Sequence, residues 1–180
     1  IRPLGRLVFD TAARQQAAWL AAGHDLLVSV NLSARQLRHS GLLDELRDML
    51  HTSGADPRRI QLEITESMLL GLDGEMQALL QDIQSLGLRI ALDDFGTGYS
   101  NLAYLQRFPI STLKIDRSFV QSVEANRPLA ELIVAMCRLM RLGVVAEGVE
   151  TTEQLDWVHT HRIEQCQGYL FSHAVAAADF

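Results

Sequence analysis

The sequence predicts an α/β fold, in which six strands alternate with helices as in a TIM-like (β/α) barrel. Short apolar runs alternate along the chain with longer amphipathic stretches, a pattern typical of parallel strands joined by helical crossovers. Within these runs the polar residues share one face, as Gln61 and Glu63 do against Leu62 and Ile64. An open doubly wound sheet would show the same alternation. Polar strand ends on one face favour a barrel whose carboxyl-terminal mouth holds the chemistry.

Breaks such as Asp56-Pro57 and Gly87 separate the elements. The expected strands are residues 26–33, 59–66, 88–94, 112–116, 143–150 and 165–171. The expected helices between them are residues 42–50, 75–86, 101–108 and 127–142. We therefore expect one domain, residues 1–180, made of six βα units. A TIM barrel has eight such units in about 250 residues, so its first two strands are expected to be missing from this sequence.

The composition is ordinary for a soluble globular domain, with 48% hydrophobic and 21% charged residues. A net charge of −6 argues against a nucleic-acid polymer or an acidic membrane surface as a partner of this segment. Cys137 and Cys166 lie in apolar contexts without CxxC spacing, which predicts reduced thiols in a cytoplasmic domain. Charged residues interrupt the most apolar helical stretch, so no membrane contact by this segment is expected. A membrane anchor elsewhere in the complete protein stays compatible with this composition.

Polar side chains fall at or near the ends of five predicted strands. They are Asn31, Glu63, Asp93, Asp94, Lys114, Asp116 and Glu147. A single carboxylate at a strand end is ordinary loop polarity, but in a barrel these ends converge on one mouth. Several negative charges around one lysine would repel each other unless cations were bound. Oxygen ligands without a Cys or His cluster predict Mg²⁺ or Mn²⁺ rather than zinc, and adjacent aspartates suit a two-metal phosphodiester site.

The glycines that follow the paired aspartates, in Gly96-Thr97-Gly98, resemble a nucleotide loop only weakly. They form neither GxGxxG nor a P-loop with lysine. We expect them to let the backbone turn closely over the metal site.

Six motifs in order then identify a resemblance. They read VNLS, LEITE, ALDDFGTGYSNLAYL, LKIDRSFV, VVAEGVET and QGYLF. Together they resemble the EAL family of cyclic di-GMP phosphodiesterases over residues 4–180. The resemblance implies a TIM-like barrel that hydrolyses one phosphodiester of cyclic di-GMP, giving the linear dinucleotide, with Mg²⁺ or Mn²⁺.

By motif position, the resemblance also implies roles for individual residues. The implied metal ligands are Asn31, Glu63, Asp93, Asp94 and Glu147. Lys114, Glu147 and Glu66 are implied catalytic residues, and the general base is left open between Lys114 and Glu147. Glu66 is implied to anchor the DDFGTG loop, in a role distinct from Glu63 because the two cannot share a strand face. Gln167 and Asp116 are implied to contact the substrate.

The sequence also departs from the family pattern. The Glu-Ala-Leu motif that names the family is absent, and with it one metal ligand, so hydrolysis by these 180 residues alone is expected to be impaired. Near the end, Arg162-Ile163 replaces the usual Gly-Cys, and Ala174 stands where a proline is usual. These differences are local and leave the implied roles of the site residues unchanged. A receptor that binds cyclic di-GMP without cutting it is the alternative, although such receptors usually lose metal ligands. A homodimer is expected, with additional sensory or GGDEF domains in the complete protein.

Overall fold

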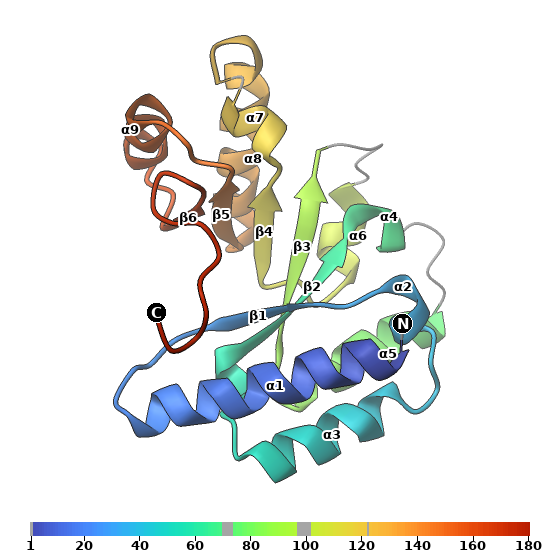
Figure 1. Ribbon diagram of the computed structural model, residues 1–180. Coiled ribbons are helices and arrows are strands. Elements are labelled where there is room, and N and C mark those ends of the chain that lie inside the picture. The colour runs from blue at the N-terminus through green and yellow to red at the C-terminus, as the bar shows by residue number, and fades with distance from the viewer. Residues whose placement is uncertain (1, 70–73, 97–101, 122) are drawn as a thin grey trace. The chain divides into compact units, whose positions relative to one another are not determined.

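The computed structural model describes residues 2–69, 74–96, 102–121 and 123–180 (Figure 1). The chain divides into two compact units. The first comprises Ile1–Ala91 and Leu102–Ile110, and the second comprises Leu92–Asn101 and Ser111–Phe180. Among the described residues, no helix combines the length and the apolar character that crossing a bilayer would require.

The first unit is built from α1 (Arg2–Ala21), β1 (Val28–Asn31), α2 (Ala34–Leu37), α3 (Leu42–Ser53), a 3₁₀ turn (Pro57–Arg59), β2 (Ile60–Thr65), α4 (Glu66–Leu69), α5 (Gly74–Ser85), the start of β3 (Arg89–Phe95) and α6 (Leu102–Arg107). β1 and β2 pair in parallel, with Asn31 opposite Glu63 and Ser29 opposite Gln61. The sheet order in this unit is β1-β2-β3. Parallel neighbours of this kind confirm the βα organisation that the alternation predicts.

β2 is buried on both faces, as strands of a parallel sheet usually are. Ile60, Leu62 and Ile64 are at most 1% exposed. On the other face Gln61 is 2% exposed and Glu63 is 7% exposed. The Gln61 Nε2 amide donates to Ser29 Oγ at 3.2 Å, which partly compensates the loss of water. The alternation in sequence therefore separates two buried environments, one aliphatic and one polar.

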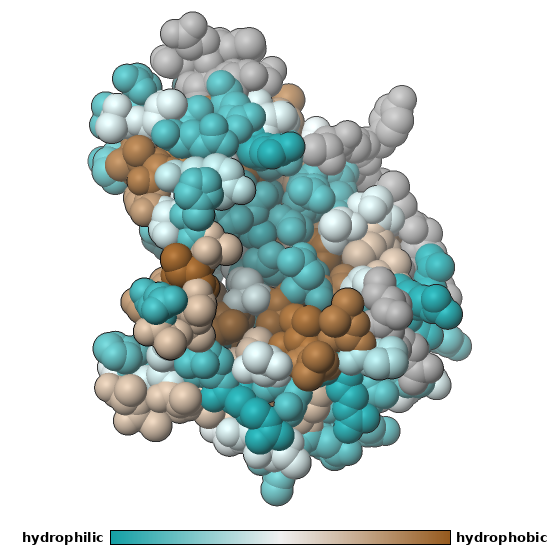
Figure 2. Space-filling view, in the orientation of Figure 1, coloured by the Kyte–Doolittle hydropathy of each residue, from teal (hydrophilic) through white to brown (hydrophobic). Residues whose placement is uncertain are grey.

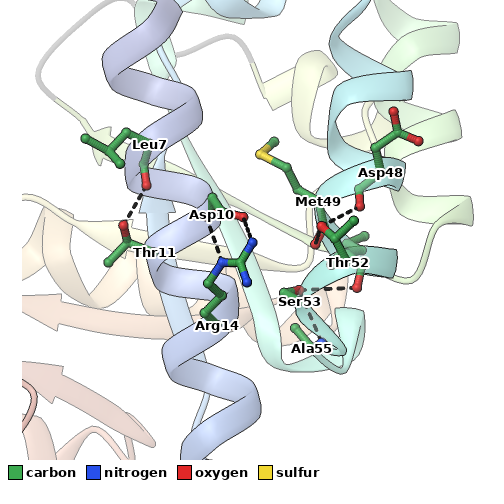
Figure 3. A network of polar contacts seen from close by, with 10 residues as sticks. Leu7, Asp10, Thr11, Arg14, Asp48, Met49, Thr52, Ser53 and Ala55 are labelled. Atoms are coloured by element: carbon green, nitrogen blue, oxygen red, sulfur yellow. Dashed lines mark hydrogen bonds and ion pairs between the residues drawn. The ribbon is translucent and has the colours of Figure 1, made fainter.

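Helices α1 and α3 lie side by side in the first unit (Figure 1). Figure 3 shows the Asp10–Arg14 ion pair on α1, 2.8 Å long, next to the part of α3 that carries Asp48 and Thr52. A cavity of about 470 Å³ opens between the two helices, and in the described part of the chain its lining includes none of the predicted site residues. Figure 2 shows hydrophobic residues gathered over α1, where Leu4 and Leu7 are exposed.

The second unit contains the end of β3, β4 (Thr112–Ile115), α7 (Arg117–Gln121), α8 (Val123–Met140), β5 (Gly143–Glu147), α9 (Thr152–Thr160) and β6 (Gln165–Gln167). Its sheet order is β3-β4-β5-β6. β5 pairs in parallel with β4 and with β6, and Glu147 stands opposite Gln167. A capping box of Thr151 and Gln154 begins α9.

All six predicted strands are present, but several predicted ends are wrong. β2 ends at Thr65, and Glu66 begins α4 instead of ending a strand. The strand predicted to reach residue 150 ends at Glu147, because Gly148 has φ +69° and leaves the extended conformation. The position requires glycine, since a Cβ there would lie 2.5 Å from Arg117 Cβ. The last strand ends at Gln167, where the backbone turns back against Val149.

The helix predicted to begin near Pro128 begins at Val123, so the proline lies inside α8. Proline is favoured in the first turn, which is why the sequence suggested a start there. The segment before it contains good helix formers, and the helix continues through the proline at the cost of one backbone hydrogen bond. Helices α1, α2, α4, α7 and α9 are additional to the four helices expected between the strands.

Candidate active site

Three carboxylates of the second unit meet at the ends of two strands. Asp93 and Asp94 lie just before the last residue of β3, Glu147 ends β5, and one oxygen of each residue lies within 4.8 Å of the others. Successive residues of an extended strand point to opposite faces, so adjacent aspartates would normally diverge. Asp94 has φ +55°, in the left-handed region that aspartate tolerates better than most residues. This local conformation breaks the alternation and accounts for the convergence of the two carboxylates.

Lys114 supplies the cation of the cluster. It lies on β4, between β3 and β5 in the sheet, and is only 4% exposed. Its Nζ lies 3.0 Å from Asp93 Oδ1 and 2.6 Å from Glu147 Oε1. Among the chain's 16 basic residues it is the only lysine. A compact ammonium with three rotatable donors can serve both carboxylates at once.

Gln167 and Asp116 complete the polar surroundings in this unit. Gln167 Nε2 donates to Glu147 Oε1 at 2.7 Å, so that oxygen accepts from both Gln167 and Lys114. Asp116 precedes α7, and its Oδ1 accepts from Ser118 N at 3.0 Å and from Ser118 Oγ at 2.5 Å. Asp116 therefore has a structural role at the start of a helix. Ser118 was not among the predicted site residues, although an aspartate at a predicted strand end before a helical stretch is a signal for such a cap.

The balance of charge in the cluster is negative. Asp93, Asp94 and Glu147 oppose one ammonium, so three negative charges and one positive leave a formal charge of −2. Partial removal from water raises the pKa of Asp94 above its usual value, and the nearby charges of Asp93 and Asp116 raise it further. Lys114 acts in the opposite direction. A bound cation would relieve the same repulsion.

The donor chemistry of the cluster fits a hard divalent cation. Its side chains offer carboxylate oxygens, which Mg²⁺ and Mn²⁺ accept. No cysteine or histidine belongs to this group of residues within the described ranges, as a zinc site would generally require. The residues present therefore fit the cation class that the sequence predicted.

The predicted ligands Asn31 and Glu63 belong to the first unit. Asn31 is the last residue of β1 and is the register partner of Glu63 on β2, and Leu32 N donates to Glu63 O at 2.9 Å beside them. Glu63 is buried and Asn31 is exposed. Glu66 is also buried, at 8% exposure, at the start of α4. Thr97 and Gly98 of the predicted glycine loop lie outside the described residues.

Comparisons with known proteins show the family to which the chain is related. The family model of the EAL domain matches residues 1–174. The cyclic di-GMP phosphodiesterase NbdA of Pseudomonas aeruginosa is 41% identical over 175 residues, which cover 95% of this chain and 22% of NbdA. The chain thus spans less than a quarter of the length of that relative.

Solved structures agree with the sequence comparison. A structure of the P. aeruginosa MucR phosphodiesterase in complex with cyclic di-GMP is similar with a TM-score of 0.94 and 38% identity. The match covers 98% of this chain and 73% of that one. A manganese and cyclic di-GMP complex of Klebsiella pneumoniae BlrP1 has a TM-score of 0.80 and 30% identity, over 94% of this chain and 44% of that one. These likenesses confirm the α/β, TIM-like fold class, and the chain belongs to the EAL domain family.

Proposed function

We propose that the protein containing this chain hydrolyses one phosphodiester bond of cyclic di-GMP, giving the linear dinucleotide, with the aid of two divalent cations. The observation that carries the proposal is the convergence of Asp93, Asp94 and Glu147 around the buried Lys114. A cluster of carboxylates around one lysine ammonium is suited to bind metal ions that assist phosphodiester hydrolysis. The similar proteins NbdA and MucR are named as phosphodiesterases, and the MucR structure holds cyclic di-GMP.

Asp93, Asp94 and Glu147 are the proposed holders of the cations, and Asn31 and Glu63 are proposed as further ligands. Support for the last two comes from their motif positions and from their adjacency at the ends of paired strands. Mg²⁺ and Mn²⁺ are the proposed ions, and manganese accompanies cyclic di-GMP in the BlrP1 complex. When bound, such ions would act as Lewis acids on the phosphodiester and make water a better nucleophile.

Of the two candidate bases, we favour Glu147. Lys114 Nζ is flanked by two carboxylates at 2.6 and 3.0 Å, which favours its charged form. An ammonium has three donors and no lone pair with which to accept a proton. Lys114 is therefore suited to hold a phosphate oxygen and to orient Asp93 and Glu147, and a carboxylate is left to take the proton of the attacking water.

Glu66 and Asp116 are proposed to act indirectly or at the edge of the site. Glu66, which is buried directly after β2, is proposed from its motif position to anchor the DDFGTG loop. Asp116 accepts the hydrogen bond from Ser118 Oγ at the start of α7, and we propose that it also contacts the substrate. Glu66→Ala should weaken the binding of both metal and substrate, whereas Ser118→Ala should affect substrate binding through Asp116 alone.

The chain, residues 1–180, is proposed to be one EAL-type domain that works in the cytoplasm alongside sensory or GGDEF domains. NbdA is several times longer than the matched region, which supports additional domains. A second copy of the chain is a proposed partner through α8, where Leu129, Leu132 and Leu139 are 47%, 63% and 87% exposed on one helix face. Leu132→Glu with Leu139→Glu should give a smaller particle in light scattering, and Leu20→Glu on α1 should not.

The test of the activity compares the complete protein with its Asp93→Asn variant. The wild type should convert cyclic di-GMP to the linear dinucleotide with Mg²⁺ or Mn²⁺, followed by chromatography. The variant should lose this activity and keep its fold, because the ion pair of Lys114 with Glu147 remains. The matched control is Asp44→Asn, an exposed aspartate paired with Arg47 on α3. Tight binding of cyclic di-GMP without cleavage by the wild type would instead indicate a receptor.

A further inference from the structure

One carboxylate oxygen of Glu147 accepts from two donors. Lys114 Nζ lies 2.6 Å from Glu147 Oε1, and Gln167 Nε2 lies 2.7 Å from the same atom. We propose that Gln167 is a positioning residue that orients the Glu147 carboxylate for cation binding, rather than a residue that binds the substrate. The inference rests on the proposed function, because it concerns the same cluster of carboxylates.

The strand geometry brings the two side chains together. Glu147 and Gln167 are direct register partners on the neighbouring parallel strands β5 and β6. Side chains of register partners point to the same face of a sheet and lie next to each other. The contact therefore follows from backbone pairing and does not depend on a mobile loop.

The backbone after Gln167 is tied to the segment that follows Glu147. Val149 N donates to Gln167 O, and Leu170 N donates to Val149 O, both at 3.0 Å. Gly168 approaches Val149 so closely that a Cβ on it would lie 2.0 Å from Val149 O. These contacts fix the position from which the Gln167 amide reaches Glu147.

Two donors on one carboxylate oxygen restrict how the carboxylate rotates. Asp93 shows the same arrangement, since its Oδ1 is 3.0 Å from Lys114 Nζ and accepts from Asp94 N at 3.1 Å. In metal sites, hydrogen bonds of this kind orient the ligating carboxylates and tune their affinity for the ion. Lys114 and Gln167 thus prepare Glu147 as a ligand before any cation arrives.

The amide is the suitable group for this task on electrostatic grounds. A second lysine or an arginine would also donate to Glu147, but its positive charge would oppose the entry of a divalent cation. The amide of Gln167 donates a hydrogen bond without adding charge, and it leaves the cluster negative. A glutamate at this position would add a like charge and give up the donor.

The experiment compares Gln167→Met with Gln165→Met in the complete protein. Methionine keeps the length of the side chain and removes the donor. Gln165 is the matched control, because it lies two residues earlier on β6, on the same face, is also exposed, and pairs with Val145. Binding of Mn²⁺ alone is measured by calorimetry in the absence of nucleotide, and KM for cyclic di-GMP is measured separately at saturating Mn²⁺.

Gln167→Met should weaken Mn²⁺ binding by about tenfold or more, as the loss of an outer hydrogen bond to a ligand typically does. KM at saturating Mn²⁺ should stay within about twofold of the wild type, and Gln165→Met should change neither quantity. A raised KM with unchanged Mn²⁺ affinity would overturn the proposal and restore Gln167 as a substrate contact.

The two proposals fail separately. If the wild type binds Mn²⁺ through this cluster and Gln167→Met weakens that binding, the inference holds even where cyclic di-GMP is not cleaved. If cyclic di-GMP is cleaved and Mn²⁺ affinity does not depend on Gln167, the inference alone is wrong. A wild type that binds no Mn²⁺ would overturn both.

Discussion

Lys114 Nζ lies 2.6 Å from Glu147 Oε1, and this ion pair joins the two neighbouring strands β4 and β5 at the polar edge of the second unit. The Lys114 side chain is 6% exposed and that of Glu147 is 14% exposed. Both charges are therefore largely removed from water, and each depends on its partner for compensation. The same ammonium also meets Asp93, so one residue connects three strands of the sheet.

Lys114→Met should destabilise the metal-free protein. It leaves Asp93 and Glu147 without their cation, and breaking a buried ion pair by removing one partner costs about 3–5 kcal/mol of unfolding free energy. Mn²⁺ should restore more stability to the variant than to the wild type, because the ion replaces part of the lost charge. Urea denaturation in EDTA and in Mn²⁺ measures both effects. Equal stability of variant and wild type in EDTA would contradict this account of the cluster.

Gly168→Ala should disturb the end of β6. The new Cβ would lie 2.0 Å from Val149 O and 2.3 Å from Val149 N, and these are backbone atoms that cannot turn aside. We expect a loss of about 1–3 kcal/mol of unfolding free energy, as for other overpacked sites. Gly74→Ala is the matched control, because nothing lies within 4 Å of its added Cβ. In thermal denaturation Gly168→Ala should have a lower melting temperature than the wild type, and Gly74→Ala should have the same or a higher one.

Asp56 should contribute to stability in a pH-dependent way. Its carboxylate accepts from Arg58 N at 3.0 Å and caps the turn Pro57–Arg59, and the hydrogen bonds from the Arg58 side chain lower the pKa of Asp56. A lowered folded-state pKa means that the contribution is present above the unfolded value of about 3.9 and is lost as pH falls through the folded value.

Asp56→Ala should therefore cost about 1 kcal/mol at neutral pH, the usual value for a lost cap. Most of that comes from the cap, since the Arg58 side chain is 79% exposed and water screens the ion pair. The difference from the wild type should shrink as pH falls below about 4, because Asp56 is protonated first in the unfolded chain and then, at its lower pKa, in the folded protein. Asp156→Ala, at an exposed position on α9, is the control. A difference that stays constant down to pH 2 would rule out the ionised cap.

The two cysteines should react with alkylating reagents at different rates. Burial raises the pKa of Cys137 to about 12, and burial also raises that of Cys166, which is only partly enclosed. The thiolate is the reactive form, so iodoacetamide at pH 8 should modify Cys166 well before Cys137. Mass spectrometry of tryptic peptides reads both sites. Preferential labelling of Cys137 in the folded protein would contradict its placement inside the α8 packing.

Local sequence patterns were sufficient to predict the strands and the polar residues near their ends. The alternation in Ile60–Thr65 and the polar ends at Asp93, Lys114 and Glu147 follow from the two-residue period of a strand, which depends on neighbouring residues only. The same period predicted which side chains share a face. The oxygen-only donor set likewise follows from residue types, and it pointed to a hard cation before any geometry was available.

The tertiary structure decided the details that depend on contacts distant in sequence. The shared Glu147 oxygen and the end of β5 at Gly148 each depend on a neighbouring strand or helix, and the alternation of a strand gives no indication of the left-handed backbone of Asp94. Glu66 begins a helix and Pro128 lies inside one, although local propensity suggested otherwise. Propensities are worth less than about 1 kcal/mol for ordinary residues and about 3 kcal/mol for proline inside a helix, and tertiary packing commonly outweighs them. The contacts between polar residues of different motifs are therefore set by strand register and backbone turns. These involve segments that are distant in sequence, so no short stretch of the sequence predicts them.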